Sequence, residues 1–187
     1  VVVIGASTGG PQAVRQVIRD IPSDLPAAIA IVQHISSGFA EGFVRWLADT
    51  SYRPVVIASS RLALRNSIYV VAPSGYHLAV RHGFVALIEG EKPQYQRPRA
   101  DVLFETAAEA YGSSVIAVLL TGMGRDGAEG CRAVLDAGGT TIVQDEATSV
   151  VYGMPRAAVD IGAAQEILPL DRIGKRIAAI VYRRGAS

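Results

Sequence analysis

The sequence predicts an α/β domain in which helices flank a doubly wound, mainly parallel sheet. Short runs of apolar, often β-branched residues alternate along the chain with amphipathic stretches of helical periodicity. Near-continuous apolar strands separated by helices of about ten to twelve residues are typical of βαβ units, whose parallel strands are covered on both faces. Two further runs with strict alternation predict an antiparallel β-hairpin, and so a mixed sheet.

The expected elements follow in chain order. The strands are expected at Val1–Ile4, Ala28–Val32, Val55–Ala58, Ser67–Val71, Val115–Leu120, Thr140–Val143 and Glu166–Leu168. The helices are expected at Pro11–Asp20, Phe39–Asp49, Arg99–Ala110, Ala128–Ala137, Pro155–Val159 and Asp171–Tyr182. The hairpin is expected from Tyr76–Val80 and Phe84–Ile88, which Arg81-His82-Gly83 joins.

Size and composition favour one domain that spans residues 1–187. Half of the 187 residues are apolar, which is enough for one sizeable core. The polar stretch Gly90–Pro98 is the best candidate for a linker, but it is short and both of its flanks fit one domain. The chain starts with Val1 at the beginning of a strand, which suggests a domain taken from a longer protein.

The charge and the cysteine content of the chain reduce the number of functions that it can be expected to have. The formal net charge is +1, so electrostatics give no reason to expect nucleic acid or a membrane surface as a partner. No apolar run approaches the ~20 residues of a membrane span. The single cysteine, Cys131, cannot form an internal disulfide, and no cysteine and histidine spacing indicates a zinc site. These features favour a reducing, cytoplasmic compartment and predict no bound metal.

A glycine-flanked serine follows the first strand. Gly5-Ala6-Ser7-Thr8-Gly9 fits the G-x-S-x-G pattern of a nucleophile elbow, in which the turn exposes a hydroxyl for attack. The same residues fit a serine that caps the next helix, or the glycine loop of a short-chain dehydrogenase. The dehydrogenase alternative is weakened because no acidic residue ends the second strand and neither lysine has a tyrosine four positions before it.

A histidine and an aspartate follow other predicted strands at the same edge. His34 comes directly after the second strand, and Asp126 lies in the glycine-rich loop Thr121–Gly127. A serine nucleophile requires a base and an orienting carboxylate, and these loops supply both. Asp126 also fits a cap of the following helix, and Asp145 is a rival carboxylate at the end of another strand.

Three further segments, together with the three already described, complete a resemblance to a known family. The matching pieces are GASTGG (Gly5–Gly10), VQH (Val32–His34), AP…HL (Ala72–Leu78), RP…DVLF (Arg97–Phe104), TGMGRDGA (Thr121–Ala128) and QDEATSVVYGMPRAA (Gln144–Ala158). In this order they closely resemble the catalytic domain of CheB, the chemotaxis receptor methylesterase, over nearly the whole chain. The resemblance implies a cofactor-free serine hydrolase that removes methyl esters from receptor glutamates and can deamidate receptor glutamines.

The resemblance also assigns roles. It implies Ser7 as nucleophile, His34 as general base and Asp126 as the partner of His34, with Thr8 and the backbone N–H of Met123 at the oxyanion. The implied partners are the cytoplasmic helical region of methyl-accepting receptors and, in the full-length protein, a regulatory receiver domain. The alternative within this family is a docking module that has lost turnover.

Substrate contacts are expected from three further residues, namely Arg97, Arg99 and His77. Arg97 and Arg99 could engage carboxylates of an acidic partner, although the spacing alone favours solvated arginines at a helix start. The family often has Met-Pro after its active-site histidine and His-Arg-Pro-Ser at the second site. This chain has Ile35-Ser36 and Gln96-Arg97-Pro98-Arg99 instead, which leaves the identity of the receptor open.

Overall fold

A computed structural model describes residues 1–66, 68–89 and 96–185. Its main sheet has seven parallel strands in the order β10-β9-β8-β1-β2-β5-β3. The strands are β1 (Val2–Ala6), β2 (Ile29–Gln33), β3 (Val55–Ile57), β5 (Tyr69–Val71), β8 (Ile116–Leu119), β9 (Thr140–Gln144) and β10 (Glu166–Leu168). All seven predicted strands are confirmed within a few residues, Ser67 lying outside the described part.

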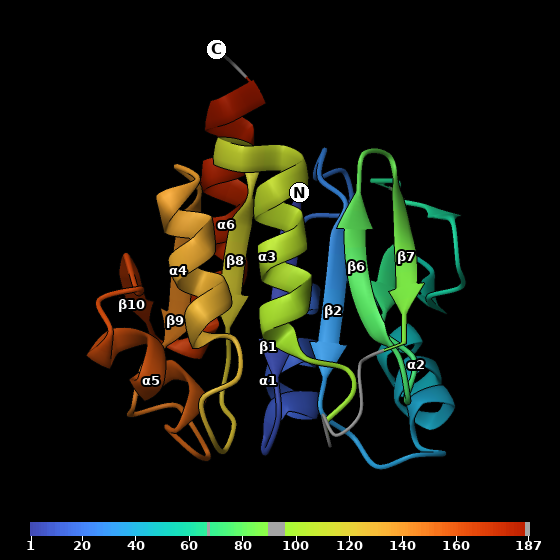
Figure 1. Cartoon of the computed structure of the whole chain (residues 1–187), viewed down its shortest axis with the longest axis horizontal. Coiled ribbons are helices and arrows are strands. Elements are labelled where there is room, and N and C mark those ends of the chain that lie inside the picture. Colours follow the sequence, from blue (N-terminus) through green and yellow to red (C-terminus); the bar gives the residue numbers. More distant parts are fainter. Residues whose placement is uncertain (67, 90–95, 186–187) are drawn as a thin grey trace.

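The order of the strands reverses beside β1. The chain first builds outward from β1 through β2, and later returns to place β8 on the other side of β1. The arrowheads of β2 and β8 point to the lower edge of the view (Figure 1). Ligands of open α/β sheets bind beyond the carboxyl ends of the strands at such a reversal. A functional site is therefore expected in the loops that follow β1, β2 and β8.

The hairpin belongs to a separate small sheet. Strands β6 (His77–Arg81) and β7 (Phe84–Ile88) pair antiparallel, and β4 (Leu62–Ala63) pairs with β7. The prediction of a hairpin is confirmed, whereas the prediction of one mixed sheet is wrong. The edge of β7 that does not pair with β6 pairs with β4 instead of a strand of the main sheet. β4 has only two residues and is too short to show a sequence pattern. The main sheet therefore stays parallel.

Helices cover both faces of the main sheet. The α-helices are α1 (Gly10–Asp20), α2 (Ala40–Ala48), α3 (Ala100–Tyr111), α4 (Ala128–Asp136), α5 (Met154–Asp160) and α6 (Leu170–Gly185), and a short 3-10 helix spans Gly112–Ser114. One hydrophobic core packs α1, α2 and α6 against the sheet, and a second packs α3, α4, α5 and the small sheet against the other face. Figure 1 shows α3, α4, β6 and β7 in front of the main sheet.

Alternate residues of β1 supply the two cores. Val2 and Ile4 point to one face and Val3 points to the other, and all three are fully buried. Cys131 lies in the second core, where burial raises the pKa of its thiol and makes it a packing residue. None of the helices in the described part is long and apolar enough to cross a membrane.

Candidate active site

The turn after β1 is held by hydrogen bonds of the Ser7 backbone and not by its hydroxyl. The Ser7 N–H donates to the Thr121 carbonyl (3.0 Å), and the Ser7 carbonyl accepts from the N–H of Gly10 (2.8 Å). Helix α1 is capped by Gly9, a residue with φ of 78°, and not by the serine side chain. Among the described residues no hydrogen bond is formed by the Ser7 Oγ. The capping alternative is therefore wrong, and the hydroxyl remains available for chemistry.

His34 reaches the same edge because β1 and β2 are parallel and in register. Ala6 pairs with Gln33, so the next residue on each strand, Ser7 and His34, leaves the sheet at one level. The N–H of His34 donates to the Ala6 carbonyl at 2.9 Å. The His34 side chain is only 8% exposed, which shields its ring from bulk water.

Asp126 lies against the imidazole. Its Oδ2 accepts a hydrogen bond from His34 Nε2 at 2.7 Å, and the Asp126 side chain is also 8% exposed. Burial by itself raises the pKa of Asp126, but the hydrogen bonds from His34 and from the Ala100 N–H outweigh it and lower the pKa to about 2. The carboxylate is therefore ionised at neutral pH.

The ionised carboxylate sets the tautomer of His34. A carboxylate can only accept hydrogen bonds, so Nε2 carries the ring proton and Nδ1 keeps a lone pair. Nδ1 is buried and has no hydrogen-bond partner among the described residues. The ring thus presents a base at Nδ1 on the side away from Asp126. Contacts between nucleophile and base often close only once substrate is bound.

Gln33 links Ser7 and His34, a role that sequence reasoning missed. Its Nε2 donates to the carbonyl of Ser7 (2.8 Å) and to the carbonyl of His34 (2.9 Å). The side chain is 3% exposed. The sequence did carry a signal for this role: Gln33 is a polar residue at the end of an otherwise apolar buried strand, and a buried amide needs hydrogen-bond partners.

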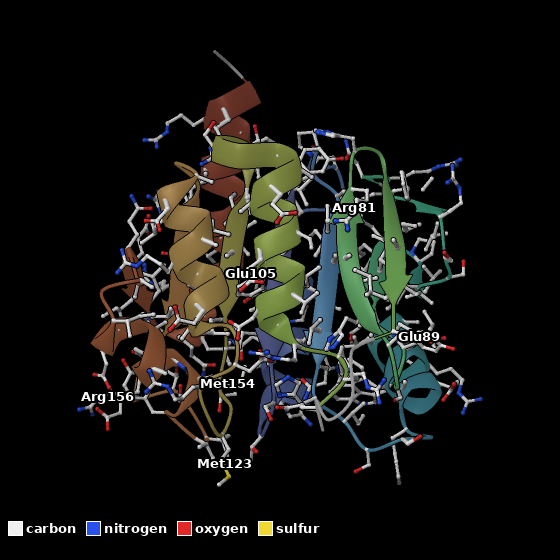
Figure 2. The ribbon with its side chains drawn as sticks, in the orientation of Figure 1. Arg81, Glu89, Glu105, Met123, Met154 and Arg156 are labelled. Atoms are coloured by element: carbon white, nitrogen blue, oxygen red, sulfur yellow. The ribbon has the colours of Figure 1, made fainter. Side chains whose placement is uncertain are left out.

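The loop after β8 approaches Ser7 closely. A Cβ on Gly122 would lie 2.7 Å from Ser7 Cβ and 2.3 Å from Met154 Sδ, so only glycine fits there. The Gly122 N–H is already used by the Val151 carbonyl at 2.9 Å. The Met123 N–H donates to no group in the described part of the chain, and the Met123 side chain is 75% exposed at the lower edge of Figure 2. In this loop the N–H of Gly122 is thus occupied, whereas the N–H of Met123, which the family resemblance places at the oxyanion, is free.

Thr8 and Asp145 also have clear positions. Thr8 is exposed beside Ser7, and its carbonyl accepts from the Thr121 hydroxyl at 2.9 Å, which ties the serine turn to the loop after β8. Asp145 accepts from the N–H and the hydroxyl of Thr148 in a local turn. The carboxylate of Asp145, the rival of Asp126, is therefore hydrogen-bonded within its own turn and not to His34.

The three expected substrate contacts do not share one environment. Arg97 lines an open pocket of about 410 Å³ next to His34. Arg99 instead directs its guanidinium to Asp126 Oδ1 (3.3 Å) and Asp101 Oδ2 (2.5 Å). His77 lies within β6 of the small sheet and is 2% exposed, so it presents almost no surface to a substrate.

Comparison with known proteins finds a matching family model and several similar proteins. A family model described as CheB methylesterase matches residues 2–177. A protein-glutamate methylesterase/protein-glutamine glutaminase of Anaeromyxobacter dehalogenans is 50% identical over 95% of this chain and 52% of its own length. The protein-glutamate methylesterase FrzG of Myxococcus xanthus is 50% identical over 92% of this chain and 52% of its own length. The chain thus spans about half the length of the curated relatives it matches.

A solved structure shares the fold. The CheB methylesterase catalytic domain of Thermotoga maritima superposes with a TM-score of 0.91 at 37% identity, covering 96% of this chain and 97% of that one. This chain belongs to the CheB methylesterase family.

Proposed function

We propose that this chain is a serine hydrolase that removes methyl esters from glutamyl side chains of methyl-accepting chemotaxis receptors, and that it also deamidates receptor glutamines. The observation that carries the proposal is the free Ser7 hydroxyl at the sheet edge where His34 is hydrogen-bonded to the ionised Asp126. Serine and a carboxylate-oriented imidazole together form the machinery of acyl transfer.

Acylation begins with attack by Ser7. Its Oγ forms a bond to the ester carbonyl carbon while its proton passes to Nδ1 of His34. The carbonyl π electrons move to the oxygen, and the N–H of Met123 donates to the resulting oxyanion, a contact worth about 3 kcal/mol of barrier. The bond to the methoxy group then breaks, and the leaving oxygen takes the proton from Nδ1 to give methanol.

Deacylation regenerates the serine. Water gives a proton to Nδ1 of His34 and bonds to the acyl carbon, after which the Ser7 oxygen leaves and recovers that proton. The product is a glutamate side chain. A glutaminyl substrate follows the same route with ammonia as the leaving group, so one acyl-enzyme serves both activities.

Asp126 holds the imidazole of His34 in the form that accepts and returns a proton in each step. It fixes the ring with Nε2 protonated and stabilises the imidazolium that exists between the two proton transfers. Every proton in these steps moves between Ser7, His34, water and the leaving group. We therefore expect the reaction not to depend on a metal or an organic cofactor.

The setting of the activity is part of the same proposal. We expect the substrate to be the cytoplasmic helical region of a receptor and the enzyme to work in the cytoplasm. The curated relatives are about twice as long as this chain, which supports a second domain in the whole protein. The family resemblance makes that domain a receiver that regulates access to the site.

The experiment is release of methanol from a methyl-esterified receptor fragment by the purified chain. We expect the parent to release methanol, with no loss in a chelator, and Ser7→Ala to fall to the uncatalysed rate. Methanol release by Ser7→Ala at the rate of the parent would overturn the proposal. Receptor binding without methanol release would instead favour the docking module, and saturable binding of NAD(P) would favour the dehydrogenase alternative.

A further inference from the structure

Next to His34, the proposed base, the starts of helices α3 and α4 are each capped by an aspartate from the start of the other helix. Asp126 precedes α4, yet its carboxylate accepts from the N–H groups of Ala100 (2.6 Å) and Asp101 (3.2 Å) at the start of α3. In return, Asp101 of α3 accepts from the N–H groups of Gly127 (2.8 Å) and Gly130 (2.9 Å) at the start of α4. The capping role expected for Asp126 is therefore real, but it serves α3 and not the helix that follows in sequence.

The exchange brings two buried carboxylates together. The Asp101 side chain is 6% exposed and that of Asp126 is 8% exposed. Burial raises the pKa of Asp101, and the charge of Asp126 adds to this effect. Like charges at this burial repel strongly unless a cation lies between them.

Arg99 is that cation. Nε donates to Asp126 Oδ1 at 3.3 Å and Nη2 donates to Asp101 Oδ2 at 2.5 Å, so one guanidinium spans both carboxylates. Burial opposes the charge on Arg99, but Asp126 and Asp101 together raise its pKa. With Arg99 in place, Asp126 Oδ1 accepts from Arg99 and the Asp101 N–H, and Oδ2 accepts from His34 and the Ala100 N–H. Both oxygens are fully used.

We propose that Arg99 is a positioning residue for the triad, which holds the Asp126 carboxylate in its orientation toward His34 and offsets part of the negative charge that the imidazole faces. The inference rests on the proposed function, since it gives His34 the role of base. A lysine cannot replace it in full, because an ammonium lacks the planar fork that reaches two carboxylates at once.

The charge balance explains why this matters for turnover. With both carboxylates ionised, Asp101, Asp126 and Arg99 together carry one net negative charge, and a neutral His34 leaves it unchanged. When His34 takes the proton of Ser7, the four groups become neutral as a set. Without Arg99 the imidazole would face two carboxylates with no cation between them, and their charge would favour the imidazolium over the neutral ring that acts as the base.

Other charged groups face this cluster and remain in all variants. They are Arg97 before α3, Glu105 on α3, Arg125 in the loop before α4 and Glu129 on α4. The Arg99 side chain is 36% exposed, so solvent screens its charge in part. We therefore expect a moderate effect, a displacement of the pH profile by about half to one pH unit.

The test is the rate at which a fluorophosphonate labels Ser7, followed by intact mass from pH 5 to pH 9. This readout needs no receptor. For Arg99→Gln we expect the rate at pH 9 to fall, because the fork that holds Asp126 is lost, and the acid limb to move to higher pH by about half to one unit, so that labelling at the lowest pH falls by a further factor of about three to ten relative to the variant's own rate at pH 9. Arg99→Lys keeps the charge, so its acid limb should stay near that of the parent while its plateau rate falls.

Arg156→Gln is the matched control. Arg156 forms an exposed ion pair with Asp160 on α5 and points outward from that helix (Figure 2). An acid limb for Arg99→Gln that coincides with the limb of Arg156→Gln, or one that moves to lower pH, would overturn the proposal. So would a normal labelling profile combined with a raised KM for a receptor fragment, since that result would make Arg99 a substrate contact.

Folding and function are separated by two further controls. Urea unfolding shows whether Arg99→Gln is folded, and Arg99→Ser provides a second variant with the same expected displacement of the acid limb. If the parent protein itself is not labelled at Ser7, the proposed function fails. If the parent is labelled and both neutral variants keep its acid limb, only the role of Arg99 fails.

Discussion

Replacing Asp126 by asparagine should cost stability in a way that depends on pH. Asparagine keeps the size of the side chain but cannot ionise. The pKa of Asp126 is about 2, against an ordinary value of 3.8. A difference of about 1.8 units corresponds to about 2 kcal/mol of unfolding free energy at neutral pH, since each unit is worth about 1.4 kcal/mol.

The sign follows from the lowered pKa. The contribution is complete above pH 3.8, where the unfolded chain also has an ionised carboxylate, and it is lost as the pH falls through 2. We therefore expect Asp126→Asn to be about 2 kcal/mol less stable than the parent at pH 7, and only about 1 kcal/mol less stable at pH 3.

Urea unfolding of both proteins measures this difference, and the single tryptophan, Trp46, supplies the fluorescence signal. Asp160→Asn is the control, because its ion pair with Arg156 is exposed and should contribute less than about 1 kcal/mol. A stability difference for Asp126→Asn that stays constant from pH 7 to pH 3 would refute the reasoning. It would mean that the hydrogen bonds of this side chain, and not its charge, carry the stability.

Two more substitutions test features that connect distant segments. Gln33→Leu removes the amide that donates to the carbonyls of Ser7 and His34, so we expect kcat for methanol release to fall about tenfold or more with a smaller change in KM, and an unchanged kcat would contradict the role of Gln33. Arg53 is 6% exposed and donates to the carbonyls of Ser23, Ala27, Leu25 and other residues, so Arg53→Met should lower the unfolding free energy by about 2–4 kcal/mol because it leaves these acceptors buried without donors. A urea midpoint within error of the parent would show that these carbonyls find other partners.

Local patterns in the sequence were sufficient for the main sheet and for the edge that carries the site. Apolar strands followed by glycine-rich or polar loops predicted that Ser7, His34 and Asp126 would lie at one edge of the sheet, because parallel strands bring their carboxyl ends to one edge. The two-residue strand β4 and the independence of the small sheet were missed, since a pairing of that length has no periodicity of its own.

The contacts around the triad were less accessible from the sequence. Asp126 was considered as a cap for the helix that follows it, whereas it caps α3, which begins 26 positions earlier. Arg99 was expected to meet an acidic partner, and it meets two acids of its own chain. Both contacts depend on how α3 and α4 pack, and pairings between distant segments leave no mark in local residue patterns.

The most direct test of the account is the site of the covalent intermediate. The protein is quenched in acid during turnover of a glutamyl methyl ester peptide, digested with trypsin and examined by mass spectrometry. We predict an acyl adduct, equal to the peptide minus methanol, on Ser7 in the fragment that ends at Arg15. Methanol release without any adduct on that fragment, or an adduct on another residue, would contradict the assignment of Ser7 as the nucleophile.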